Sequence, residues 1–310
     1  MNNFDILKSK IVANHDFSGS DEEIKALKEA ILEFNQNEEE IEKNNTVPVE
    51  YESFTKIHLS TNSKTGINIV NFNISSAYYC FEAINHHCGI QKQFKDEYGK
   101  QLNKLGCYAC SINNRQPTTL IYDVINYIAF QTLPVEEIQR QIREYLKEHP
   151  EVDFLRFNER GCFFSEKAFL KCSMVAIGLQ DVLLGTFSYT SNDELFDKYH
   201  NTTYFMVLNH SNSNNKGVKT TKIIGCSKKY LEKSRKMILD VINNPNQVLC
   251  CGDCSNCSYC KDKDDLRQVV FIRHGCGWDG HLESYLTETE IKNYLLIVQQ
   301  DHERFLASIS

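Results

Sequence analysis

Short apolar runs alternate with longer amphipathic stretches along the central part of the chain. Four runs have the length and the β-branched and aromatic content of buried strands: residues 66–72, 152–157, 182–187 and 204–208. Four stretches between these runs have helical length and composition: residues 119–131, 135–148, 166–177 and 193–199. The alternation predicts an α/β fold in which helices cover a mostly parallel sheet.

The first 45 residues form an acidic segment with a pattern of its own. Ser20 and the acidic residues after it supply the chemistry that begins a helix. The apolar residues that follow fall on one helical face: Ile24, Leu27, Ile31 and Leu32. Residues 35–45 are polar and read as a linker. We expect this segment to act as a structural flap or as an arm that binds a protein partner.

These patterns divide the chain into three parts. An acidic helical segment with its linker takes residues 1–45, an α/β domain takes residues 55–285, and a C-terminal helix takes residues 286–310. The α/β domain includes a cysteine-rich loop at 250–260. Residues 269–276 predict a last strand and a glycine-rich turn, which would bring His274 and Cys276 toward that loop.

Composition restricts the class of protein. With 310 residues and 41% apolar content, the chain can bury a sizeable core and is not a disordered tail. Its formal net charge of −7 gives no general attraction to nucleic acid, although a local basic patch stays open. No stretch is long and apolar enough to cross a bilayer, and residues 1–5 lack a signal-peptide pattern. We expect a cytoplasmic protein without a membrane partner.

The strongest chemical signal is the regular spacing of thiols between residues 250 and 260. The chain has 13 cysteines, and the reducing cytosol favours metal ligation over disulfides. Four of them recur at short, regular intervals: Cys250, Cys254, Cys257 and Cys260. A loop of this kind can wrap around one iron–sulfur cluster. The alternatives are a zinc site, which usually takes its ligands from two separated pairs, and free or disulfide-bonded surface thiols.

A second thiol-rich region follows the apolar run at 66–72. It contains Cys80, Cys88, Cys107 and Cys110, with His86 and His87 before the second cysteine. The wide gaps mean that a metal site here requires the loop to fold back on itself. The alternative is that each cysteine is a small buried apolar residue. Either histidine can replace a thiol, but a structural or surface role is the simpler interpretation.

Charged residues at the end of the run at 152–157 form a candidate binding site. Arg156 lies within the predicted strand, and Glu159 and Arg160 follow its end. Such residues can bind an anionic cofactor, and a network of surface ion pairs explains them equally well. Asn209 and His210 follow the run at 204–208, where a plain polar loop is the simpler interpretation.

The order of these motifs resembles the phage and plasmid family called gene product 88. The resemblance spans about residues 60–275 and rests on four segments in order: the cysteines that end at residues 107–109, residues 155–165, residues 187–191 and residues 252–254 with the thiols after them. It implies a partial TIM-type barrel, like that of radical-SAM enzymes, with helices outside and iron–sulfur clusters. The chain departs from the family pattern at Cys162, which stands where the family usually has an aspartate.

The resemblance and the spacing together give the cofactor prediction. Cys250, Cys254 and Cys257 match the three-thiol motif by which radical-SAM enzymes leave one iron open for S-adenosylmethionine. Cys260 supplies a fourth thiol, and full ligation favours electron transfer or a structural role. We therefore expect one or two 4Fe-4S clusters, and S-adenosylmethionine binding stays open.

Two classes of function follow. The first is an iron–sulfur protein of a phage or mobile element, in the form of a radical-SAM-like redox enzyme whose substrate the sequence does not identify. The second is a non-catalytic, zinc-stabilised interaction protein whose N-terminal arm binds a partner. A nucleic-acid-related role agrees with the resemblance but has no support from the net charge.

Overall fold

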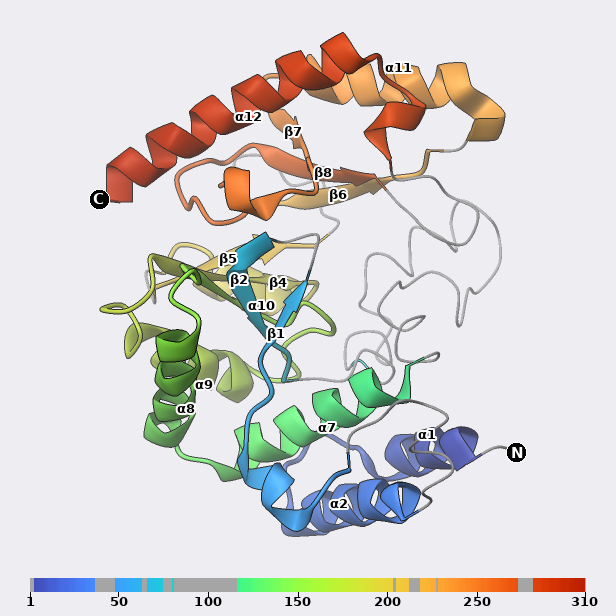
Figure 1. Cartoon of the computed structure of the whole chain (residues 1–310), viewed down its shortest axis with the longest axis vertical. Helices are drawn as coiled ribbons and strands as arrows, with labels where there is room; N and C mark the ends of the chain where they lie inside the picture. The colour runs from blue at the N-terminus through green and yellow to red at the C-terminus, as the bar shows by residue number, and fades with distance from the viewer. Residues whose placement is uncertain are drawn as a thin grey trace. The chain divides into compact units, whose positions relative to one another are not determined.

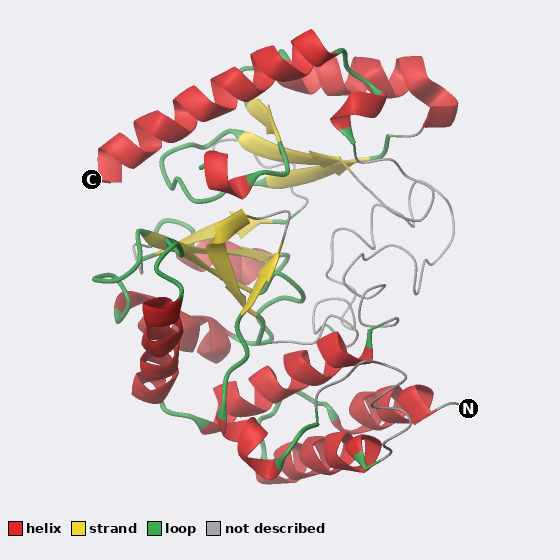
Figure 2. Cartoon of the chain, in the orientation of Figure 1, coloured by secondary structure: helices red, strands yellow, loops and turns green. Residues whose placement is uncertain are grey.

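The protein is described from a computed structural model. The residues that it describes are 3–36, 48–62, 66–74, 80, 116–202, 205–211, 218–226, 228–272 and 281–309. Helices and strands alternate through most of this part of the chain, as the apolar pattern predicted (Figure 1; helices are red and strands yellow in Figure 2). The fold is therefore α/β. The chain divides into two compact units, the first of residues 1–60, 71–150 and 156–182 and the second of residues 61–70, 151–155 and 183–310.

The first unit is mainly helical. Its helices among the described residues are α1 (Asn3–Asn14), α2 (Asp21–Asn35), the short 3-10 helix η1 (Tyr51–Thr55), α7 (Pro117–Thr132), α8 (Val135–Glu148) and α9 (Glu166–Ile177). Helix α2 begins as predicted, because the Ser20 side chain accepts a hydrogen bond from the Glu23 N–H at 3.1 Å. Its apolar face is buried, and helix α1, which the sequence analysis did not predict, buries Phe4, Leu7 and Ile11.

The strands form two sheets. The larger sheet has the order β1 (Ser60–Asn62), β2 (Gly66–Phe72), β3 (Phe154–Phe157), β4 (Gly185–Thr190) and β5 (Met206–His210). The smaller sheet has the order β6 (Thr221–Ile224), β8 (Gln268–Ile272) and β7 (Gln247–Leu249). Strands β4 and β5 pair in parallel, and so do both pairs of the smaller sheet. The mostly parallel arrangement confirms the predicted class.

A TIM-type barrel is not seen in the part of the chain that the structure describes. Neither sheet is closed, and β8 lies between β6 and β7, whereas strands of a TIM barrel follow one another in chain order. One isolated parallel bridge, between His210 and Thr220, joins the end of β5 to the start of β6. Both sheets are therefore open in the described part of the chain. The structure confirms the predicted α/β class but does not show the predicted barrel.

The second unit has two apolar clusters. Its helices are α10 (Asp193–Tyr199), the 3-10 helix η2 (Lys228–Tyr230), α11 (Leu231–Ile242), the 3-10 helices η3 (Cys254–Asn256) and η4 (Leu282–Ser284), and α12 (Glu288–Ile309), the expected C-terminal helix. The first cluster packs residues of α11 and α12 against the smaller sheet, among them Ile238, Val269 and Val298. The second consists of Ile69, Phe154, Phe187 and Phe305. None of the helices described has both the length and the apolar character needed to span a membrane.

Candidate metal centre

The cysteine-rich loop connects β7 to β8 in the second unit. Its first residue prolongs the strand pairing, because the Cys250 N–H donates to the Val270 carbonyl at 2.8 Å. The Asp253 carboxylate then holds the turn, since it accepts hydrogen bonds from the Ser255 N–H at 3.0 Å and from Asn256 Nδ2 at 2.8 Å. Cys257 and Tyr259 are buried after this turn. Hydrogen bonds and buried side chains thus hold the loop in a defined conformation.

The thiols of the loop lie near one another. Burial raises the pKa of the Cys250 thiol, and the neighbouring Cys254, Cys260 and Cys251 raise it further. A hydrogen bond with Cys257 lowers the pKa of Cys251 to about 7, and the same bond raises the pKa of Cys257. Cys260 packs against both apolar clusters of the unit, and Cys254 packs against the second. The four predicted ligands and Cys251 therefore share one largely apolar environment.

Their present arrangement is not that of a bound ion. Within the described ranges, no group of three or more His, Cys, Asp or Glu side chains has the spacing to hold a metal ion. The donor set itself suits a soft metal, because five thiols occur within residues 250–260 and become strong ligands once they lose their protons. The residues present thus fit a thiolate-ligated centre by their chemistry.

Two buried lysines lie beside these thiols. Lys261 Nζ donates to the Cys254 carbonyl at 2.9 Å and stands 4.2 Å from the centre of the Phe154 ring. Lys219 Nζ donates to the carbonyls of Tyr259 and, at 2.6 Å, Asp265. Burial lowers the pKa of both ammonium groups, whereas nearby thiols raise it: chiefly Cys254 for Lys261 and Cys260 for Lys219. The site thus contains positive charge as well as thiols.

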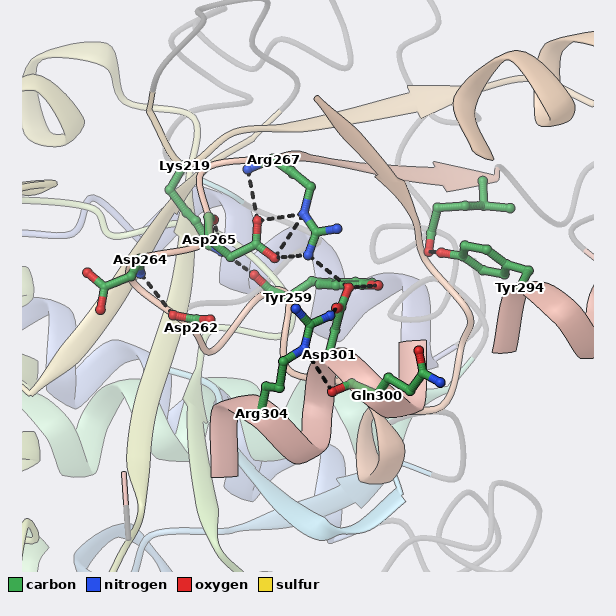
Figure 3. Close-up of polar contacts among 11 residues, drawn as sticks. Lys219, Tyr259, Asp262, Asp264, Asp265, Arg267, Tyr294, Gln300, Asp301 and Arg304 are labelled. Carbon is green, nitrogen blue, oxygen red and sulfur yellow. Dashed lines mark hydrogen bonds and ion pairs between the residues drawn. The ribbon is translucent and has the colours of Figure 1, made fainter. Parts of the chain in front are cut away.

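A polar network holds the loop in place (Figure 3). The Tyr259 hydroxyl donates to Asp301 of α12 at 2.9 Å. Arg267, which precedes β8, pairs with Asp265 at 2.6 Å and with Asp301 at 3.0 Å. Burial opposes the negative charge of Asp265, but the hydrogen bonds from Arg267 outweigh it and lower the pKa of the carboxyl. The loop is therefore fixed to α12 and to β8.

The larger sheet contributes two further contacts to the loop. Asn209, near the end of β5, donates through Nδ2 to the Cys260 carbonyl at 3.0 Å and to the Ser188 carbonyl at 3.2 Å. Gly66, the first residue of β2, lies so close that a Cβ atom there would stand 1.8 Å from Ser255 Oγ. The start of β2 and the end of β5 thus contact the loop and limit the space that it can occupy.

The second predicted cysteine site falls largely outside the described residues. Cys80 is buried. Cys88, Cys107 and Cys110 lie outside the described ranges, as do His86, His87, His274 and Cys276. The early metal site stays a prediction.

The structure adds a new partner to the charged residues after β3. Arg160 forms an ion pair with Glu159 at 3.0 Å and a two-pronged pair with Asp123 of α7, at 3.0 and 3.2 Å. Asp123 is only 1% exposed. Two carboxylates thus already neutralise the guanidinium of Arg160. Arg156 lies half-buried on β3, and an anionic ligand at Arg156 and Glu159 stays a prediction.

Sequence reasoning missed several residues of these sites. Asp123 had a visible signal, because it is the single charged residue of helix α7. Cys251 was visible as a fifth thiol. Lys219, Lys261 and Asn209 had no local signal, because their burial depends on segments that are distant in the sequence.

His210 ends β5 as a buried residue and not in an exposed polar loop. Its Nε2 atom stands 2.8 Å from Asp193 Oδ1, and its ring stacks on Phe196 with centroids 4.6 Å apart. The histidine therefore fastens α10 to the end of β5.

Comparison of the chain with models of protein families, with curated proteins and with solved structures gave no match.

Proposed function

We propose that the chain is an iron–sulfur protein whose cluster is bound by Cys250, Cys254, Cys257 and Cys260. The observation that carries the proposal is the gathering of these four thiols in one loop that packs against two apolar clusters. Each thiol must lose a proton to bind metal, and a metal is what stabilises several thiolates in such surroundings. The short, regular spacing favours a cluster over a zinc ion.

The open, mostly parallel sheet is compatible with the partial barrel implied by the resemblance to the gene product 88 family. The bridge between His210 and Thr220 supports a sheet that continues from β5 to β6. We infer that Cys260 completes the ligand set, so that the cluster transfers electrons or stabilises the loop. Binding of S-adenosylmethionine requires an open iron, which Cys260 would have to release.

Metal analysis of anaerobically purified protein tests the proposal. We expect about four irons and about four sulfides per chain with a brown colour, since one cubane has this content. About eight irons would add a second cluster at the early cysteines. Zinc without iron would contradict the proposal and favour the stapled interaction protein.

Two variants locate the cluster. The double substitution Cys254→Ala and Cys257→Ala should abolish the visible absorption and the iron content. The control is Cys162→Ala, which removes a half-buried thiol of the first unit and should leave the iron content unchanged. Unchanged iron in the double variant would reject the late loop as the ligand set.

A further inference from the structure

Lys219 and Lys261 are unusual among the cations of the second unit. Their exposed fractions are 5% and 6%, and an ammonium group in such a position is costly unless an anion neutralises it. Arg235 and Arg267 are more exposed, yet each has a carboxylate partner at 2.6 Å. Among the residues that the structure describes, neither buried lysine forms an ion pair with a carboxylate.

The groups that surround the two ammonium ions are carbonyls, an aromatic ring, thiols and, with less influence than the nearest thiol, the carboxylates of Asp153, Asp262 and Asp265. Carbonyl oxygens of Cys254, Tyr259 and Asp265 accept their hydrogen bonds but bring no net charge. The ionisable neighbours with the strongest influence are thiols of the loop, Cys254 for Lys261 and Cys260 for Lys219. Because no carboxylate pairs directly with either lysine, thiolates of the loop would add negative charge beside both, and the thiolate is the state in which these residues bind metal.

We propose that Lys219 and Lys261 neutralise the net negative charge of a thiolate-ligated centre in the loop. A cluster with four thiolate ligands is anionic, because the ligands bring more negative charge than the metal core offsets. The two lysines approach the loop from different elements, one before β6 and one directly after Cys260. This inference rests on the proposed function and adds an electrostatic partner to it.

The inference predicts that one substitution has opposite effects in the two states of the protein. In the metal-free chain, Lys261→Met removes a buried charge that forms no ion pair with a described residue, so the variant should unfold at a higher urea concentration than the wild type. In the loaded chain, the same variant should lose its cluster to an iron chelator about tenfold faster, in the range found for outer partners of metal sites. Its reduction potential should also fall, since less positive charge favours the oxidised cluster.

Three further variants control for structural effects. Lys263→Met removes a charge from the same loop, but Lys263 is exposed and pairs with Asp264, so cluster loss and potential should not change. Lys261→Gln removes the charge and keeps an N–H donor for the Cys254 carbonyl, so it should behave like Lys261→Met. Lys219→Met tests the second ammonium group should the first site not tolerate substitution.

The outcomes separate this inference from the proposed function. Wild-type protein with zinc but no iron would overturn the proposed function, and protein with neither metal would overturn both. Wild-type protein with a cluster, together with variants that match its rate of cluster loss and its potential, would overturn the inference alone. Equal destabilisation of the loaded and the metal-free chain by Lys261→Met would also overturn it, because that pattern shows only a lost hydrogen bond.

Discussion

At the scale of single residues, Glu23 joins the start of the chain to helix α7. Its Oε1 atom lies 2.6 Å from His15 Nδ1, and its Oε2 atom accepts hydrogen bonds from the Tyr127 hydroxyl at 2.8 Å and the Gly19 N–H at 2.7 Å. Burial opposes the charge of the carboxyl, but these hydrogen bonds outweigh it and lower its pKa to about 2. The N-terminal helices are thereby fixed within the first unit.

Substitution of Glu23 by Gln should destabilise the protein in a pH-dependent way. A carboxyl with a lowered folded-state pKa stabilises the fold above its unfolded-state pKa, and the stabilisation is lost as the pH falls toward the folded-state value. We expect the variant to be less stable by about 3 kcal/mol at pH 7. The difference should shrink between pH 5 and pH 2, as measured by urea denaturation.

The matched control is Glu33→Gln on the same helix, because the Glu33 side chain is 62% exposed and pairs with Lys10 at the surface. Its effect should stay below about 1 kcal/mol, as for other exposed ion pairs. A stability difference for Glu23→Gln that stays constant from pH 7 to pH 2 would show that the carboxylate charge is not the cause.

At the scale of elements, the start of β2 sets the room for the cysteine loop. Gly66 has φ +82°, and an added Cβ would collide with Ser255 Oγ. Gly252 has a similar φ of +76° but nothing within 4 Å of an added Cβ. The two glycines therefore share the backbone strain of a substitution, and only Gly66 adds a collision with the loop.

Gly66→Ala should lower both the stability and the metal content, because the loop must move to accommodate the methyl group. Gly252→Ala should cost about 1 kcal/mol of stability through strain and keep more of the metal. Iron content and urea denaturation of the two variants test this. Equal metal content in both would show that the approach of β2 does not position the ligands.

Helix α12 holds the loop through the hydroxyl of Tyr259. Tyr259→Phe removes the hydrogen bond to Asp301 and leaves Arg267 and Arg304 to satisfy that carboxylate, so we expect a loss of about 1 kcal/mol in the free energy of unfolding. Tyr230→Phe, at an exposed tyrosine, should have no effect beyond experimental error. Thermal or urea unfolding measures both, and a neutral Tyr259→Phe would mean that packing alone fixes the loop.

Elements with strong local signals were predictable from the sequence. Helices α8, α9 and α10 have the bounds that the apolar pattern predicted, and the side chains of Ser165 and Asn192 cap the last two. Strand β4 begins at Gly185, three residues after the predicted start, because the apolar run extends beyond the paired segment. Strands β6 and β7 have four and three residues and exist through their pairing with β8, so no local pattern reveals them.

The candidate site also combines features that a local sequence pattern reveals with features that depend on distant residues. Thiol spacing is a property of the sequence, and it located the loop. The charge balance of the site depends on which distant groups become buried together. Lys261 cannot be distinguished from Lys263 two residues later until the fold shows that the first is buried and the second exposed.

At the scale of the whole molecule, the described parts of the candidate centre belong to a single compact unit. The five thiols of the loop, both buried lysines and their supports on β5 and α12 lie in the second unit. The network around Glu23 and the pair of Asp123 with Arg160 lie in the first. Because a metal that binds only the folded state adds its binding energy to folding, metal should stabilise the second unit directly.

Hydrogen exchange of the loaded and metal-free full-length protein tests where this stabilisation acts. Metal should slow exchange of the amides at 250–261, where thiolate ligation closes the loop, and of β8, which pairs with β7 ahead of the loop. Amides of α1, α2 and α7 should exchange at the same rate in both forms. The double variant Cys254→Ala and Cys257→Ala should lose the metal-dependent protection while keeping that of α7. Protection that spreads evenly over both units would instead mean that they unfold as one cooperative body.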